Sequence, residues 1–387
     1  MAGSSFGTIY RITTWGESHG PALGVVIDGC PAGLSLCEED IQKYLDRRKP
    51  GQSEFTTKRK ESDTVQILSG IFDGRTTGTP ISLMVRNADH HSADYSNIAE
   101  TYRPGHADFT FDQKYGFRDY RGGGRSSGRE TIGRVAGGAV AAAILSELGI
   151  SFLTYTGSIG PVSIDPEHFD ADEIRRNPLY MPDAAAAQKA REHLNQCMNA
   201  QDSAGGTIVC EIFGLPAGIG DPVFEKLDAV LAKAMLSIGA VKGFEIGEGF
   251  HAAALPGSVN NDCFYTDAHG RIKKETNHSG GTLGGMSDGA DLVFRVAIKP
   301  TPSISRPQKT VRKDGSPCEL VIHGRHDPVI VPRAVVVVEA MAAITILDLM
   351  LCGMGAKLEN LRDRYRFDVP VFPPSDRSAA PNDRNSL

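Results

Sequence analysis

Alternating apolar and polar positions open the chain. Residues 8–14 and 24–28 alternate in this way and are rich in threonine, isoleucine and valine, which is typical of short strands. The sequence GESHG at 16–20 lies between them. The pattern therefore predicts that the first polar chemistry of the chain lies in a loop between two strands. Further strands are predicted at 65–68, 80–85, 207–213 and 291–298.

Helical spacing marks five other stretches. The clearest is 131–148, where apolar residues recur three and four positions apart and many are small enough to let a helix pack closely against a sheet. The stretch 38–48 has the same spacing and ends before Pro50-Gly51, which cannot continue a helix. The other predicted helices cover 184–198, 227–237 and 332–351. This mixture of strands and helices predicts an α/β fold of the α+β type.

Long glycine-rich loops separate these elements. Residues 89–128 show little periodicity but contain many His, Asp, Tyr, Arg and Gly residues, and loops of such length are usually functional. The runs 239–249 and 277–289 are also rich in glycine, which supplies 43 of the 387 residues. That abundance indicates tight turns or close approach of the backbone to a ligand.

The domain organisation follows from what the chain lacks. It has no repeat at a fixed period and no linker-like segment before its C-terminal end, so we predict a single domain over residues 1–367. Residues 368–387 have the composition of a disordered tail.

Composition excludes several classes of protein. Apolar residues make up 40% of the chain, charged residues 23%, and the net charge is only -6, as in a soluble globular protein. The seven cysteines are odd in number and form no C-x-x-C pair, and the histidines lack metal-ligand spacing, so neither a disulfide framework nor a metal site is expected. The N-terminus has no signal-peptide core, and Glu339 and Asp348 interrupt the longest apolar stretch, so we expect a cytoplasmic protein outside the membrane.

Arginines gather in one part of this acidic chain. Six of them lie between Arg103 and Arg134, with three consecutive glycines at 122–124 among them. Arginine forks suit carboxylates and phosphates, so we infer a small molecule with several anionic groups. Surface pairing with aspartates would account for about half of these arginines. Nucleic acid is disfavoured, since the pI is near 6.0 and no aromatic residues are interleaved on a basic domain.

The segment Arg125-Ser126-Ser127-Gly128-Arg129 directly precedes the clearest helix. Its hydroxyls and amides would lie at a helix N-terminus, where the helix dipole favours a phosphate. Capping of the helix by one of the serines is the plainer alternative. The chain has no Walker sequence and no G-x-G-x-x-G after a strand, so a P-loop kinase and a Rossmann dehydrogenase are disfavoured.

Two histidines stand out by context. His19 in GESHG and His106 in RPGHAD each lie in a loop, where a histidine can act as a general acid beside a phosphate leaving group. A structural or exposed histidine is the alternative for each. The cluster GRHDP at 324–328 could supply an anion-binding Arg325 and a relay carboxylate, Asp327, or could be a turn with an Arg-Asp pair.

Seven motifs in order along the chain carry a specific likeness. They are GESHG at 16–20, DRRKPGQ at 46–52, RPGHAD at 103–108, QKYGFRDYRGGGRSSGRET at 113–131, NHSGGTLGG at 277–285, KPTPSIS at 299–305 and GRHDP at 324–328. Together they resemble the chorismate synthase family over roughly residues 5–353. The resemblance implies a β-α-β sandwich with helices between antiparallel sheets, assembled as a homotetramer.

The resemblance also implies a reaction. The family converts 5-enolpyruvylshikimate 3-phosphate to chorismate and phosphate by an anti 1,4-elimination, which needs reduced FMN although no net redox change occurs. A substrate with one phosphate and two carboxylates agrees with the arginine cluster. NADPH is a possible reductant of the flavin, and since the chain has no obvious NADPH domain we expect an external reductase.

Site residues are carried over by the same likeness. His106 resembles the acid that protonates the departing phosphate, His19 the histidine that protonates reduced flavin, and Asp327 the carboxylate that assists proton removal. Arg48 and Arg129 match anion-binding positions for substrate or NADP. Positions that bind FMN are matched by Arg125, Ser126, Ser127, Gly239, Ala240, Gly284, Lys299, Pro300, Thr301, Pro302, Ser303 and Arg325.

Four positions depart from the family pattern. Glu54 stands where many members have a second basic residue, a role open here to Arg59 or Lys60. Gly128 replaces a usual alanine, and Gly239 replaces Asn or Pro. Pro302 replaces a common serine and removes a hydroxyl and an N–H, so weaker FMN contact is expected there.

Two other functions compete with this lyase. One is an NADPH-dependent flavin oxidoreductase of the same fold, which would consume NADPH in proportion to its substrate. The other is a non-catalytic polyanion-binding protein, which would tolerate loss of both His19 and His106.

Overall fold

Two five-stranded antiparallel sheets organise the computed structural model, which describes residues 3–56, 61–87, 99–322 and 327–365. The first sheet has the order β1-β2-β3-β7-β4 and the second the order β11-β16-β10-β8-β9. The first comprises β1 (Ser5–Phe6), β2 (Arg11–Gly16), β3 (Ala22–Asp28), β4 (Val65–Ser69) and β7 (Ile81–Arg86). The second comprises β8 (Ser151–Ile159), β9 (Val162–Ser163), β10 (Gly206–Phe213), β11 (Val241–Ile246) and β16 (Leu292–Ile298).

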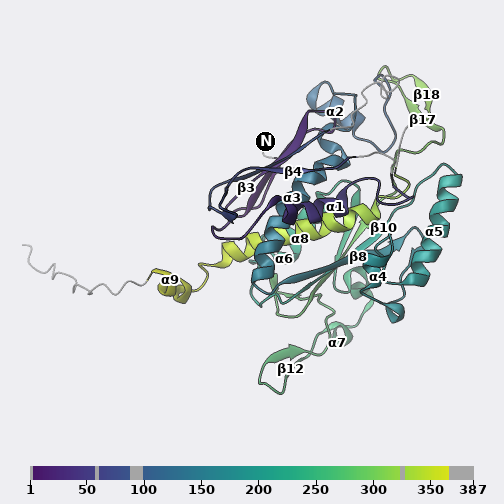
Figure 1. Cartoon of the computed structure of the whole chain (residues 1–387). Coiled ribbons are helices and arrows are strands. Elements are labelled where there is room, and N and C mark those ends of the chain that lie inside the picture. Colours follow the sequence, from purple (N-terminus) through teal and green to yellow (C-terminus); the bar gives the residue numbers. More distant parts are fainter. Residues whose placement is uncertain (1–2, 57–60, 88–98, 323–326, 366–387) are drawn as a thin grey trace, which may run out of the picture. The chain divides into compact units, whose positions relative to one another are not determined.

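Helices fill the space between the sheets, as Figure 1 shows for α1, α3 and α8. Helix α3 (Thr131–Glu147) contacts β2, β3 and β7 of the first sheet and β8 of the second. Gly138 permits its close packing on α8 (Val331–Gly353), because a Cβ there would lie 2.3 Å from that of Ala340. The β-α-β sandwich implied by the resemblance is therefore confirmed.

The other elements are shorter or lie at the edges. The remaining helices are α1 (Glu38–Arg48), α2 (Asp108–Tyr115), α4 (Glu173–Arg176), α5 (Ala184–Asn199), α6 (Leu227–Leu236), α7 (Gly257–Asn260) and α9 (Leu358–Tyr365). Four two-stranded hairpins pair β5 (Ile71–Phe72) with β6 (Arg75–Thr76), β12 (Phe264–Thr266) with β13 (Ile272–Lys274), β14 (Thr282–Leu283) with β15 (Met286–Ser287), and β17 (Gln308–Val311) with β18 (Pro317–Leu320).

The predicted first strand begins three residues too early. The backbone N–H groups of Thr8, Ile9 and Tyr10 donate to the carboxylate of Asp348 at 2.8, 2.7 and 3.0 Å. These residues alternate as a strand would, but their donors are bound by the last turns of α8, so β2 starts at Arg11. Asp348 thereby ties the residues before β2 to helix α8.

Two predicted loops contain regular structure. The loop predicted at 89–128 contains α2, and the glycine-rich run at 239–249 contains β11. β8 was not predicted at all, because its second half is buried on both faces and does not alternate.

The chain divides into two units, residues 1–352 and residues 353–387. Helix α9 belongs to the second unit. Residues 366–387, and with them the predicted disordered tail, lie outside the described residues. The single domain over 1–367 stays a prediction.

Among the described residues, α8 alone has the length and apolar composition of a membrane-spanning helix. Its most apolar window is 83% buried inside the fold, as in the core helix of a soluble protein.

Candidate active site

The loop that carries His106 is closed by a buried ion pair. Arg103 donates to Asp108 through Nε at 2.8 Å, Nη2 at 2.7 Å and its backbone N–H at 3.0 Å. Burial by itself would raise the pKa of Asp108, but the hydrogen bonds and charge of Arg103 outweigh it and hold that pKa below its usual value. Arg103 and Asp108 thus form a clasp around the loop.

His106 is held by both ring nitrogens. Nδ1 lies 2.9 Å from the carbonyl oxygen of Pro104, and Nε2 lies 2.9 Å from the hydroxyl of Ser303. A carbonyl only accepts, so Nδ1 carries the proton of the neutral ring and Nε2 accepts from Ser303. Burial lowers the pKa of His106 to about 4, and the positive charge of Arg103 acts in the same direction. The ligand-free ring is therefore neutral near pH 7.

The segment 299–303 packs directly against this loop. Lys299 Nζ donates to the carbonyl oxygen of Gly105 at 2.9 Å, and a Cβ on Gly105 would lie 2.8 Å from that of Pro302. The carbonyl of Thr301 accepts from the hydroxyl of Ser203 at 2.7 Å. Within the described residues, Thr301 Oγ1 is buried and has no hydrogen-bond partner. Two motifs far apart in the sequence thus form one wall.

Acidification is expected to weaken folding through His106. The unfolded pKa is about 6.5 and the folded pKa is about 4, so between these values the unfolded chain binds more protons. Stability should fall as the pH drops from about 6.5 towards 4, by on the order of 1 kcal/mol after allowance for partial exposure. Urea unfolding of the wild type and His106→Asn at pH 7 and pH 4.5 checks this. A wild type that loses no more stability than the variant would contradict it.

Opening the clasp is expected to slow a reaction that depends on His106. Asp108→Asn removes the charge that Arg103 pairs with, so the His106 loop should lose its fixed shape. Misplacing a reacting group by about 1 Å can cost up to a hundredfold in rate, so we expect kcat to fall about ten- to a hundredfold. Steady-state kinetics measure this. Asp267→Asn, which opens an exposed pair with Arg271, is the control, and an unchanged kcat for Asp108→Asn would refute the clasp.

The loop of His19 is fixed from two sides. Nδ1 of His19 lies 3.0 Å from Ser18 Oγ, and a Cβ on Gly122 would lie 2.3 Å from the same ring nitrogen. Asn87 Nδ2 donates to the carbonyl oxygens of Glu17 at 3.0 Å and Gly20 at 2.7 Å. Only glycine at 122 allows the two loops to approach this closely.

The hydroxyls of the R-S-S-G-R segment are used within the loop. Ser126 donates to the carbonyl oxygen of Gly123 at 2.7 Å, and Ser127 Oγ accepts from the N–H of Arg129 at 3.3 Å. Ser127 thus caps the short 3-10 turn Gly128–Glu130 that precedes α3, whereas α3 itself follows Glu130 without a side-chain cap, so neither serine caps that helix directly. Arg125 donates to Thr14 Oγ1 at 2.6 Å and to Gly16 O at 3.0 Å, which ties this segment to β2.

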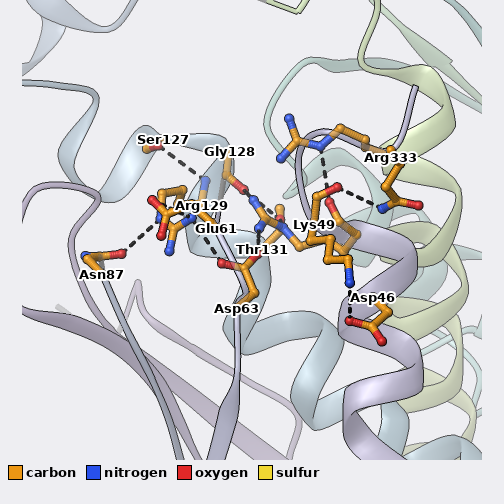
Figure 2. A network of polar contacts seen from close by, with 12 residues as sticks. Asp46, Lys49, Glu61, Asp63, Asn87, Ser127, Gly128, Arg129, Thr131 and Arg333 are labelled. Atoms are coloured by element: carbon orange, nitrogen blue, oxygen red, sulfur yellow. Dashed lines mark hydrogen bonds and ion pairs between the residues drawn. The ribbon is translucent and has the colours of Figure 1, made fainter. Parts of the chain in front are cut away.

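Two buried arginines share one carboxylate beneath this loop (Figure 2). Arg48 Nη1 lies 2.7 Å from Asp63 Oδ2, and Arg129 Nη1 lies 3.2 Å from Asp63 Oδ1. Burial lowers the pKa of Arg48, and the nearby charges of Arg333 and Arg129 act in the same direction against that of Asp63. A guanidinium nevertheless stays protonated in proteins. We call Arg48, Arg129 and Asp63 the arginine–aspartate cluster.

The two arginines differ in how many of their guanidinium N–H donors are already hydrogen-bonded. Arg48 also donates from Nε to Thr131 Oγ1 and from Nη2 to Gly128 O, both at 3.0 Å. Arg129 donates from Nε to Asn87 Oδ1 at 3.0 Å, and in the described part of the chain its buried Nη2 has no hydrogen-bond partner. Arg129 is therefore better placed than Arg48 to meet an anion.

Asp327 lies beside this cluster. Arg333 Nη1 contacts Asp327 Oδ2 at 2.6 Å. Arg333, labelled in Figure 2, also donates from Nε to the carbonyl oxygen of Arg48 at 3.1 Å. The chain next to Asp327 is fixed because Ala204 N donates to Pro328 O at 2.9 Å. Arg325, matched to FMN binding, lies outside the described residues.

The remaining matched positions fall into two groups. Ala240 accepts from Lys299 N at 2.9 Å, so Gly239 and Ala240 adjoin the segment 299–303. Gly284 lies in the β14–β15 hairpin, which among the described residues hydrogen-bonds to Ile219 and Leu227 and not to either histidine loop. The hairpin of Gly284 is thus tied to the chain around the start of α6 by the hydrogen bonds of the described residues.

Glu54, the acidic departure from the family pattern, pairs with Arg191 at 2.8 Å on the surface. Its proposed substitutes, Arg59 and Lys60, lie outside the described residues.

Sequence reasoning missed three polar residues that position the site. Asp63 pairs with both arginines of the cluster, Asn87 joins the His19 loop to Arg129, and Arg333 joins Asp327 to Arg48. Asp63 and Asn87 each lie close to a strand end, which is a usable signal. No sequence signal marks Arg333, because it lies within an apolar helix.

Comparisons with known proteins agree with one another. A sequence model of the chorismate synthase family matches residues 10–351. A chorismate synthase of Agathobacter rectalis is 67% identical over 366 residues, 95% of this chain and 100% of that protein. One from Roseiflexus castenholzii is 52% identical over 93% of this chain and 100% of that protein. A crystal structure of chorismate synthase superposes with a TM-score of 0.73 at 31% identity, covering 93% of this chain and 97% of that one.

Proposed function

Because this chain belongs to the chorismate synthase family, we propose that its described loops bind reduced FMN and substrate around His106, His19 and Asp327. The chain is a lyase that eliminates phosphate from 5-enolpyruvylshikimate 3-phosphate to give chorismate, without net redox change. The oxidoreductase alternative is not favoured, since the relatives compared above are all chorismate synthases.

The observation that carries the proposal is the hydrogen bond between His106 and Ser303 beside Lys299. His106 is oriented by Pro104, so that Nε2 faces a hydroxyl and a nearby ammonium group, which are groups that bind phosphate. A phosphate dianion in place of the hydroxyl would raise the pKa of His106, because an opposite charge favours the imidazolium. His106 would then hold a proton at Nε2 for the departing phosphate.

The segment 299–303 also fits a flavin mononucleotide. Thr301 Oγ1 is a buried oxygen without a hydrogen-bond partner in the described residues, as a ligand contact would leave it. Lys299 and Arg125 supply positive charge, and Ser303 a hydroxyl. When bound, reduced flavin supplies an electron-rich ring that can lend charge to the substrate and regain it.

The other site residues have separate tasks in this proposal. Asp327 accepts the proton lost from the substrate. His19 holds a proton close to where the reduced flavin would bind. Arg129 binds an anionic group of the substrate or of NADP, while Arg48 mainly orders the loop of Gly128 and Thr131.

Assembly and location belong to the same proposal. We infer a cytoplasmic homotetramer whose flavin is reduced from outside, with NADPH as a possible source of electrons. Exposed apolar side chains support association: Val223, Phe224 and Phe250 are 72, 87 and 82% exposed in one chain.

An anaerobic assay tests the proposal. The chain is incubated with 5-enolpyruvylshikimate 3-phosphate and chemically reduced FMN, and phosphate, chorismate and flavin oxidation are followed. We expect product without net flavin oxidation, and none with oxidised FMN alone. Folded protein that forms no product with reduced FMN would refute the flavin dependence. Product formed in proportion to flavin oxidation would favour the oxidoreductase.

A further inference from the structure

Arg333, on α8, connects Asp327 with the end of α1. It lies in the first turn of α8, and its side chain is 17% exposed. Nη1 contacts Asp327 Oδ2 at 2.6 Å, while Nε donates to the backbone carbonyl of Arg48 at 3.1 Å. One planar group thus fixes a carboxylate and the end of α1 in a single geometry.

The Arg48 end of this bridge is itself rigid. Its side chain is 3% exposed and reaches Asp63, Gly128 O and Thr131 Oγ1. Arg333 is therefore braced against a buried network and not against solvent. The carbonyl that it uses comes from the last residue of α1, where helix carbonyls lack intrahelical partners.

The side chain of Asp327 is oriented by its contact with Arg333. Its neighbour Pro328 is held through Ala204, but that contact fixes the backbone and leaves the direction of the carboxylate open. The guanidinium of Arg48, whose backbone carbonyl Arg333 uses, pairs with Asp63, which Arg129 shares.

We propose that Arg333 is a positioning residue for the lyase reaction, which aims the carboxylate of Asp327 so that it can take up the substrate proton. This rests on the proposed role of Asp327 as proton acceptor. Among the described residues Arg333 contacts the carboxylate of Asp327 and the carbonyl of Arg48, and the effect proposed here runs through Asp327.

The pH dependence of kcat/KM separates this role from simple structural support. Arg333→Gln is expected to move the acidic limb of the profile to higher pH by about 1 unit or more, since the opposite charge that favoured the ionised carboxylate is gone. Arg333→Lys keeps the charge but cannot make both contacts. It should restore the position of the limb while kcat stays below that of the wild type.

Arg47→Gln is the matched control. Arg47 also forms a fork with a carboxylate of α8, donating to Glu339 at 2.8 and 2.7 Å, but neither residue contacts Asp327. We expect this variant to lose thermal stability and to leave the acidic limb in place. Equal shifts in Arg47→Gln and Arg333→Gln would overturn the inference.

Asp327→Asn separates the proton-acceptor role of Asp327 from the positioning role of Arg333. Should it keep wild-type activity, the proton-acceptor role fails and the role of Arg333 fails with it. Should it lose activity while Arg333→Gln keeps the wild-type limb, only the positioning role is overturned. If Arg333→Gln does not fold, Arg333→Lys decides: a wild-type kcat with lysine would show that the bridging geometry does not matter.

Discussion

His106→Ala is expected to lower kcat by about 10²- to 10⁴-fold, the usual contribution of general acid catalysis. The variant loses the ring whose Nε2 lies 2.9 Å from the Ser303 hydroxyl, next to the Gly105 carbonyl that Lys299 contacts. The departing phosphate would then leave without a proton. Chorismate formation under saturating substrate and reduced FMN measures the effect.

The control for this prediction is His251→Ala. His251 is exposed and pairs with Glu248 at 2.6 Å, away from the segment 299–303. It should keep the wild-type kcat. A His106→Ala variant with wild-type kcat would exclude His106 as the acid. A rise in KM at unchanged kcat would instead reduce it to a binding residue.

Asp63→Asn is expected to destabilise the fold by about 3 to 5 kcal/mol, as when one partner of a buried ion pair is removed. Asp63 is 1% exposed and is shared by Arg48 and Arg129, so its loss removes the carboxylate that Arg48 contacts at 2.7 Å and leaves Arg129 with that of Glu61 at 3.4 Å. Asparagine also tolerates the positive φ of 47° at this position, which limits the backbone contribution. The free energy of unfolding in urea measures the change.

Asp28→Asn provides the comparison. Asp28 pairs with Arg11 at 3.4 Å with about half of each side chain exposed, so its loss should cost less than about 1 kcal/mol. Similar losses for Asp28→Asn and Asp63→Asn would show that the arginine–aspartate cluster is not a buried charge network.

The helices could be predicted well because their signals are local. Helix α1 begins and ends as predicted, since Pro50-Gly51 prevents its continuation. Helix α2 was missed because its apolar side chains are largely exposed, as Phe109 is at 53%, so no buried stripe marks it. Its first residue, Asp108, is held by Arg103, a contact that periodicity does not reveal.

The site could be predicted only as separate motifs. His106 and Ser303 are 197 positions apart, and no local pattern indicates that they hydrogen-bond. The same holds for Arg333 and the carbonyl of Arg48, which are 285 positions apart. Motif resemblance identified candidate residues, whereas their partners depend on how the two sheets and the helices between them pack.

The carboxylate of Asp348 has a consequence for synthesis of the chain. It accepts the N–H groups of residues 8–10, so the entry to the first sheet is completed by a residue near the end of the compact unit. A nascent chain on the ribosome lacks this acceptor until almost the whole unit has emerged. Until then the connection between β1 and β2 has three N–H groups without their final acceptor, so the N-terminal part of the sheet is completed only late in synthesis.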